Sequence, residues 1–252
     1  MAGHSKWAQI KHKKARMDQR RGKLFTKLIR EITVAAKMGG PNPDANPRLR
    51  SAIEVARSYN MPNANIERAI KRATGGEGPV NLEEVSYEGY GPGKVAILVE
   101  TLTDNRNRTT SEIRHVFSKY GGNLGSSGCV SWLFHNRGIF LIDRNEYDED
   151  RILDLAVDSG AIDFKVEGST YQIITKPEDF HKFREILKKN NIQVIQAELT
   201  KIPQSTVRIE DARNAERVLK LFEQLDSLDE VQHVYANFDI PEEIMEKFSE
   251  GD

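Results

Sequence analysis

Between residues 137 and 203, segments with strand periodicity and segments with helix periodicity follow one another in the order βαββαβ. Apolar residues alternate with polar ones in the strands and recur every three or four positions in the helices. The expected strands are 139–143, 162–166, 170–175 and 193–199, and the expected helices are 149–159 and 177–189. This order defines the ferredoxin-like α+β unit. We therefore predict that residues 137–203 form one such domain.

The segments on either side of this unit repeat the same order in two halves. Before it, the pattern predicts a strand at 95–102, a helix opened by the capping box Thr109-Thr110-Ser111-Glu112, and a strand through Val130, Trp132 and Phe134. After it, the pattern predicts a strand at 205–209, a helix capped by Asp211 and a strand at 231–236. The two halves together make a second ferredoxin-like set of elements.

These patterns predict the domain organisation. We expect a discontinuous ferredoxin-like domain of residues 80–136 plus 204–240, into which residues 137–203 are inserted, and an acidic C-terminal tail at 241–252. Two consecutive domains remain an alternative, because sequence patterns do not show which strands pair.

The first 79 residues carry only helical signals. Leu24, Leu28 and Ile32 recur at the spacing of one buried helical face between Lys13 and Lys37. Glycines and prolines at 39–43 end that helix, Asn46 and Pro47 open a second one to Tyr59, and a third runs from after Pro62 to Ala73. The predicted fold class is therefore α+β: an N-terminal three-helix domain followed by two ferredoxin-like α+β domains, one inserted in the other.

The charge is divided sharply along the chain. The first 79 residues hold 17 Lys and Arg against 6 Asp and Glu, so they carry +11, whereas the remainder carries -12 and the whole chain -1. A basic module joined to an acidic body is typical of a protein that binds a polyanion. The alternative is that the two halves neutralise each other across an interface.

The first predicted helix has a cationic stripe. Arg16, Arg20, Lys23, Lys27 and Arg30 are spaced by four, three, four and three residues, which places them on one side of the helix, away from its apolar face. Neighbouring positive charges repel one another unless an anion lies opposite them. The interpretation is a nucleic-acid contact surface, to which we add further basic residues and one aromatic residue of this segment: Lys6, Trp7, Lys11, Lys13, Lys14, Arg48, Arg50 and Arg68.

A second candidate contact lies outside the basic segment. The stretch from Asp104 to Arg108 joins a predicted strand to a predicted helix and presents Arg106 and Arg108 beside backbone N–H groups that could bind phosphate. The alternative is that Asp104 forms a salt bridge with one of these two arginines.

Signals for catalysis, metals and membranes are weak. Cys129 is the only cysteine, and His4 and His12 lack further ligands at metal-binding spacing. Ser126 and Ser127 lack a nucleophile motif, and the glycine-rich stretch 121–128 is typical of a helix cap and a loop. No apolar run is long enough to span a bilayer. We expect a cytoplasmic, non-enzymatic protein without a cofactor, a bound metal or a membrane partner.

Short motifs are distributed along the whole chain. They are MAGHSKW at 1–7, RGKLFTKLIRE at 21–31, NPRLR at 46–50, NMP at 60–62, NIERAI at 65–70, YEGYGPG at 87–93, TDNRNRT at 103–109 and GNLG at 122–125. Together these motifs resemble the YebC family.

The resemblance implies a three-domain cytoplasmic protein and a probable transcriptional regulator that binds DNA. Other family members, including a mitochondrial one, are similar to translation factors that act on the ribosome. We therefore predict a nucleic-acid-binding regulator of gene expression whose target is DNA, with ribosomal RNA and the ribosome as the alternative. The acidic body would serve as a scaffold or as a docking surface for a protein partner.

Overall fold

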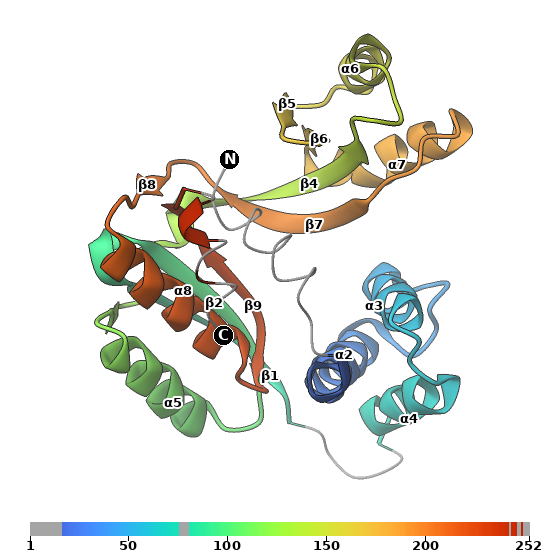
Figure 1. Ribbon diagram of the computed structural model, residues 1–252. Coiled ribbons are helices and arrows are strands. Elements are labelled where there is room, and N and C mark those ends of the chain that lie inside the picture. Colours follow the sequence, from blue (N-terminus) through green and yellow to red (C-terminus); the bar gives the residue numbers. More distant parts are fainter. Residues whose placement is uncertain (1–16, 76–80, 242, 246–247, 249–252) are drawn as a thin grey trace. The chain divides into compact units, whose positions relative to one another are not determined.

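The computed structural model describes the backbone of residues 17–75, 81–241, 243–245 and 248, and the side chains from residue 22 onward. The chain divides into two compact units. The first unit comprises residues 1–132 and 205–252, and the second comprises residues 133–204. The first unit consists of an N-terminal bundle of helices and, further along the chain, a sheet with helices of its own. The second unit consists of one sheet and its helices (Figure 1).

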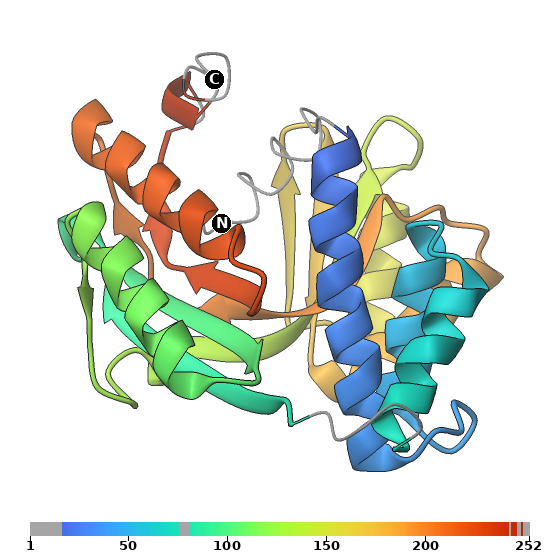
Figure 2. The ribbon, with the colours of Figure 1, turned by 90° about the horizontal axis from the view of Figure 1, so that it is seen from below.

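The N-terminal part of the first unit is a bundle of three helices, α2 (Met17–Gly39), α3 (Pro47–Ser58) and α4 (Asn63–Ala73). The long helix α2 packs against both of the others (Figure 2). Ile32 of α2 and Leu49 and Ala56 of α3 are fully buried between them. The prediction of N-terminal helices, including the start of α3 after Asn46, is confirmed.

Asn46 joins two helices of the bundle. Its Oδ1 accepts a hydrogen bond from the Leu49 N–H at 3.1 Å, and its Nδ2 donates to the carbonyl oxygens of Ala35 at 2.7 Å and Gly40 at 2.9 Å. The side chain is buried. Asn46 therefore caps α3 and at the same time satisfies carbonyl groups near the C-terminal end of α2.

Replacing Asn46 with Ala is expected to lower the free energy of unfolding by about 2–3 kcal/mol, because the cap is lost and buried backbone groups are left without partners. Urea unfolding of the full chain measures this change. Asn42→Ala is the matched control, since the Asn42 side chain accepts one exposed hydrogen bond, from the Asp44 N–H. An equal loss in both variants would contradict the role of Asn46.

The second part of the first unit is a four-stranded sheet covered by two helices. Its strands are β1 (Glu83–Tyr90), β2 (Ala96–Thr103), β3 (Asn123–Leu124) and β9 (Val231–Ala236), and its helices are α5 (Arg106–Lys119) and α8 (Ala212–Asp226). The strand order is β3-β1-β2-β9, and every pair is antiparallel. Both helices lie on the same face of the sheet (Figure 1) and contribute Phe117 and Leu219 to its core.

Two strands predicted for this outer sheet are wrong. Ser131–Leu133 forms a 3₁₀ turn, and Phe134 already belongs to a strand of the second unit. From 205–209 only Val207–Arg208 (β8) is extended, and it pairs with β10 (Phe238–Asp239) outside the main sheet. The unpredicted strand β1 lies between β2 and β3 instead. It is the strand position that the third strand of a ferredoxin-like unit would occupy.

The second unit has the predicted order βαββαβ. Its elements are β4 (Phe134–Asp143), α6 (Glu149–Asp158), β5 (Asp163–Glu167), β6 (Thr170–Thr175), α7 (Phe180–Lys189, preceded by the 3₁₀ turn η3, Pro177–Asp179) and β7 (Gln196–Pro203). The strand order β5-β6-β4-β7 is antiparallel throughout. β4 begins earlier than predicted and β7 ends later, because the two strands pair from Phe134 with Pro203 to Leu141 with Gln196.

The α+β fold class is therefore confirmed, with N-terminal helices followed by two sheet domains of which one is inserted in the other. β9 completes the outer sheet after the chain has passed through the second unit.

Candidate nucleic-acid interface

The predicted contact residues fall into two sets. Lys6, Trp7, Lys11, Lys13, Lys14 and Arg16 lie outside the described residues, and Arg20 lies in α2 at a position whose side chain is not described. The structure describes the side chains of the other eight, which are Lys23, Lys27, Arg30, Arg48, Arg50, Arg68, Arg106 and Arg108.

Three cations of the α2 stripe contact the outer domain, which is the four-stranded sheet of the first unit with its helices α5 and α8. The Nζ of Lys27 donates to the carbonyl oxygen of Asp226 at 2.7 Å and to its Oδ1 at 3.2 Å. The Nζ of Lys23 donates to the carbonyl oxygen of Ser227 at 3.1 Å. Asp226 is the last residue of α8, and the carbonyl groups at the C-terminus of a helix carry partial negative charge. Two lysines of the bundle therefore meet an electronegative helix end.

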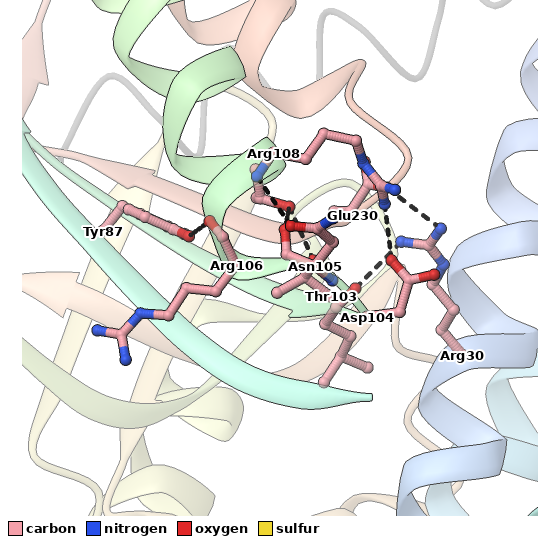
Figure 3. Close-up of polar contacts among 10 residues, drawn as sticks. Arg30, Tyr87, Thr103, Asp104, Asn105, Arg106, Arg108 and Glu230 are labelled. Carbon is pink, nitrogen blue, oxygen red and sulfur yellow. Dashed lines mark hydrogen bonds and ion pairs between the residues drawn. The ribbon is translucent and has the colours of Figure 1, made fainter. Parts of the chain in front are cut away.

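Arg30, one helical turn further along α2, contacts a buried carboxylate. Its Nη1 donates to the Leu102 carbonyl at 3.0 Å, and its Nη2 lies 3.5 Å from the Oε1 of Glu230. The same Oε1 accepts a hydrogen bond from Nη2 of Arg108 at 2.9 Å (Figure 3). The Glu230 side chain is only 10 % exposed, so one carboxylate holds two arginines with little competition from water.

The alternative ion pair joins Asp104, just before the N-cap of α5, to Arg108 in the first turn of that helix. Nη2 of Arg108 donates to Oδ1 of Asp104 at 2.7 Å. This hydrogen bond lowers the pKa of Asp104 below its ordinary value and raises the pKa of Arg108. The side chain of Arg106 points away from this cluster in Figure 3. Of the two arginines, Arg106 is thus the one that this cluster does not hold, while the side chain of Arg108 is held by it and is still 44 % exposed.

Helix α5 begins at Arg106, three residues before the predicted capping box. The cap is Asn105, whose Oδ1 accepts from the Arg108 N–H at 3.1 Å. The Thr109 hydroxyl is buried against the Thr103 hydroxyl at 2.8 Å. The predicted cap at Thr109 is therefore wrong. Asparagine is among the residues preferred at an N-cap, and Asn105 takes this position four residues earlier.

Arg48 is held within the first unit by carboxylates. Its Nε and Nη2 donate to the two carboxylate oxygens of Glu31 at 2.7 and 3.1 Å, and its Nη1 forms an ion pair with Glu84. The hydrogen bond to Glu31 raises the pKa of Arg48 further above its ordinary value. Such a bidentate pair restrains the guanidinium and leaves it less available to phosphate.

The prediction of an exposed stripe therefore needs correction at Lys27 and Arg30, whereas Lys23 is exposed. Lys27 and Arg30 have side chains only 14 % and 21 % exposed, and both bind groups of the outer domain. The spacing of these residues shows that they lie on one side of the helix, but it does not show which other part of the protein lies against that side. The alternative interpretation, neutralisation across an interface, describes the contacts of Lys23, Lys27 and Arg30.

Other cations of the bundle are exposed. The side chains of Arg50 on α3 and Arg68 on α4 form no hydrogen bond or ion pair within the described part of the chain, and the same holds for two neighbours that the sequence analysis did not select, Arg57 and Lys71. Arg50 and Arg57 are seven residues apart, and Arg68 and Lys71 are three apart, so the members of each pair lie on one side of their helix. Arg57 and Lys71 could have been found from the sequence by their helical spacing from Arg50 and Arg68.

One buried carboxylate was missed by the sequence analysis. Glu88 of β1 accepts hydrogen bonds from the backbone N–H groups of Gly128 at 2.7 Å, Val130 at 2.7 Å and Ser131 at 2.8 Å. Gly121, with a φ of 79°, follows the end of α5. The glycine-rich stretch is thus a helix end, the short strand β3 and a loop that Glu88 fixes to the sheet.

The structure also bears on metals and membranes. Among the residues that it describes, no group of three or more His, Cys, Asp or Glu side chains is placed to hold a metal ion. No helix in the described ranges is long and apolar enough to cross a membrane.

Comparison with known proteins gives matches along the whole chain. Residues 5–76 match the model of the TACO1/YebC protein N-terminal domain, and residues 82–238 match that of the TACO1/YebC second and third domain. A probable transcriptional regulatory protein of Sulfurihydrogenibium sp. is 57% identical over 248 residues, which are 98% of this chain and 99% of the relative.

Two further matches come from Aquifex aeolicus. A probable transcriptional regulatory protein is 54% identical over 247 residues, or 98% of this chain and 99% of the relative. The crystal structure of a conserved hypothetical protein superimposes with a TM-score of 0.82 at 53% identity, and the match covers 94% of this chain and 97% of that one.

Proposed function

Because the chain belongs to the TACO1/YebC family, in which its similar relatives are named probable transcriptional regulatory proteins, we propose that it regulates transcription by binding DNA. The N-terminal helical bundle is the main contact surface in this proposal. The observation that carries it is the set of exposed cations on α3 and α4, namely Arg50, Arg57, Arg68 and Lys71.

These four cations suit the phosphate backbone. A guanidinium presents its N–H groups as a planar fork that matches two phosphate oxygens, and an ammonium acts as a compact point charge. Arg50 and Arg57 are separated by about two helical turns, or roughly 10 Å along α3. Contacts of this kind fix the position of a protein on a duplex without reading bases.

The action of the protein is then occupancy of a site on DNA rather than turnover of a substrate. Within the outer domain, Arg106 is exposed beside the first turn of α5 and can add one phosphate contact. Arg108 and Arg48 serve instead to hold carboxylates. The acidic remainder of the chain repels polyanions elsewhere on its surface and so favours binding at the bundle.

The proposal is tested by replacing Arg50, Arg57, Arg68 and Lys71 together with Gln. We expect affinity for duplex DNA to fall about tenfold or more at moderate salt, and the slope of log K against log salt to decrease by about 0.9 for each phosphate group that is no longer bound. Fluorescence anisotropy at several salt concentrations measures both quantities. The fold is expected to persist, because all four side chains are exposed.

A matched control removes four other exposed cations from the second unit: Lys176, Lys182, Lys188 and Lys189. This variant changes the net charge equally and is expected to bind almost as the native chain does. Equal losses in both variants would reject the bundle as the specific surface. Each titration is repeated with structured RNA and with ribosomes, and tighter binding to these at equal salt would transfer the proposal from DNA to RNA.

A further inference from the structure

The described partners of Lys23, Lys27 and Arg30 in the α2 stripe are hydrogen-bond acceptors. Lys23 and Lys27 bind the carbonyl groups of Ser227 and Asp226, and Lys27 also binds the Asp226 carboxylate. Arg30 binds the Leu102 carbonyl and the Glu230 carboxylate. A row of carbonyl and carboxylate oxygens offers to these cations what the phosphate oxygens of a nucleic-acid strand would offer.

We propose that the C-terminal end of α8, together with Glu230, is an internal competitor of nucleic acid for Lys23, Lys27 and Arg30. The stripe has two mutually exclusive occupants, and nucleic acid must displace the internal one before it reaches these cations. This inference rests on the proposed function, because it concerns the same helical bundle. It adds the largely covered side chains of Lys27 and Arg30, which become available only when the bundle leaves the end of α8.

The contacts explain why the two occupants exclude each other. Both terminal nitrogens of Arg30 already contact oxygens, and the side chain of Lys27 is largely covered. A phosphate group that approached either cation would have to replace Asp226 or Glu230. It would also bring a negative charge beside those carboxylates, which is unfavourable while they remain in place.

The structure also explains how the internal occupant can leave. The buried apolar cluster of the bundle includes Ile32 and Leu49, whereas that of the outer domain includes Ile97 and Phe117, and the two clusters share no residue. The contacts between the stripe and α8 are polar and contain ion pairs, which salt and polyanions weaken. Release of these contacts, and of the exposed ion pair between Arg48 of the bundle and Glu84 of β1, therefore leaves both apolar clusters closed.

Glu230 remains ordered when the bundle is released. Its carboxylate is still bound by Arg108, and its carbonyl oxygen accepts a hydrogen bond from the Leu102 N–H at 2.8 Å. The acceptor surface is thus preformed on the outer domain. The bundle returns when the α2 cations bind these acceptor groups again.

The test uses the full chain with Asp226→Asn and Glu230→Gln. The native affinity is reduced by the fraction of molecules in which the stripe is open, so weakening the internal occupant is expected to raise the affinity for duplex DNA by about threefold or more. The control, Asp229→Asn with Glu216→Gln, removes two charges from the same helix and the same loop but no partner of the stripe. It is expected to change the affinity much less.

A second comparison separates competition from a general change in charge. In a Lys27→Gln, Arg30→Gln background, Asp226→Asn with Glu230→Gln is expected to give no more gain than the control, since the contested cations are gone. Circular dichroism and urea unfolding verify the fold of each variant. If Glu230→Gln unfolds the chain, Asp226→Asn against Asp229→Asn provides the same comparison, with a smaller expected gain.

The outcomes distinguish this inference from the proposed function. Equal affinities for the Asp226/Glu230 variant and its control, in a chain that binds DNA through α3 and α4, would overturn the internal competitor alone. Loss of all polyanion binding from the native chain would overturn both.

Discussion

Replacing Glu88 with Ala is expected to lower the free energy of unfolding of the first unit by about 3–5 kcal/mol. Three backbone N–H groups lose a charged acceptor, and each such hydrogen bond contributes roughly 1.5–3 kcal/mol, less the cost of burying the carboxylate. The side chain is only 4 % exposed, so water does not replace it readily. Urea unfolding, followed by the near-ultraviolet signal, measures the change.

The control for Glu88→Ala is Glu84→Ala. Glu84 lies on the same strand, but its side chain is 49 % exposed and forms an ion pair with Arg48. Exposed ion pairs contribute about 0–1 kcal/mol, so the control should unfold almost as the native chain does. Similar losses from the two variants would show that Glu88 does not anchor the loop.

The contribution of Glu88 depends on pH in a defined direction. Burial opposes its ionisation, but the hydrogen bonds from Gly128, Val130 and Ser131 outweigh burial, so the pKa of Glu88 lies below its ordinary value of 4.5. A depressed pKa in the folded state gives stability that is fully present above the unfolded pKa and is lost as the pH falls through the folded pKa. The difference between the native chain and Glu88→Gln should therefore shrink below pH 4.5.

Phe183→Ala is expected to lower the free energy of unfolding of the second unit by about 3–5 kcal/mol, the usual result of removing a buried phenyl ring. Phe183 is fully buried, and its ring meets that of Phe140 edge-on at a centroid distance of 4.8 Å. A fragment of residues 133–204, which contains the whole βαββαβ unit, is the simplest protein in which to measure it. We expect that fragment to unfold in one cooperative transition.

Two comparisons make this expectation falsifiable. A fragment of residues 137–203 lacks the pairs of Phe134, His135 and Asn136 with β7 and should be less stable than 133–204. In the full chain, Phe183→Ala should shift one calorimetric transition and leave the other in place. A single transition that shifts as a whole would mean that the two units unfold together.

Elements with a buried face were the ones that the sequence predicted well. β6 and β9 have the predicted ends, and α8 begins after its predicted cap Asp211. In each of these elements, local hydrophobic periodicity and the environment in the fold agree. Such agreement allows strands and helices to be recognised without knowledge of their partners.

β1 was missed because a charged residue, Glu88, occupies a buried position in it. Glu84, Ser86 and Glu88 alternate with Val85 and Tyr87, and the burial of Glu88 depends on N–H groups located about 40 residues further along the chain. A charged residue in an apolar pattern is normally evidence against burial. The three N–H groups that bind the Glu88 carboxylate are brought to it only by the tertiary structure.

The candidate interface was predictable in its residue types but not in its contacts. Helical spacing placed Lys23, Lys27 and Arg30 on one side of α2, and in the structure each contacts a different residue at or just beyond the end of α8. Their acidic partners lie about 200 residues away in sequence, as Lys27 and Asp226 illustrate. Spacing within one helix contains no information about such a distant partner.

The position of β9 in the outer sheet has a consequence for synthesis of the chain. β2 lies between β1 and β9, but β9 is made only after the whole second unit. At about 5–20 residues per second, the roughly 130 residues between the end of β2 and the start of β9 take on the order of 6–26 s to synthesise. During that interval one edge of β2 has no strand beside it.

During synthesis, the sheet that begins first is therefore the one that is completed last. The second sheet has all its strands once β7 has emerged, whereas the first, begun earlier, is still missing β9. An unpaired edge of an apolar strand such as Ala96–Thr103 can pair with another chain. On a crowded polysome, this interval is the time at which neighbouring copies are most exposed to mispairing, and slower elongation through residues 133–230 lengthens it.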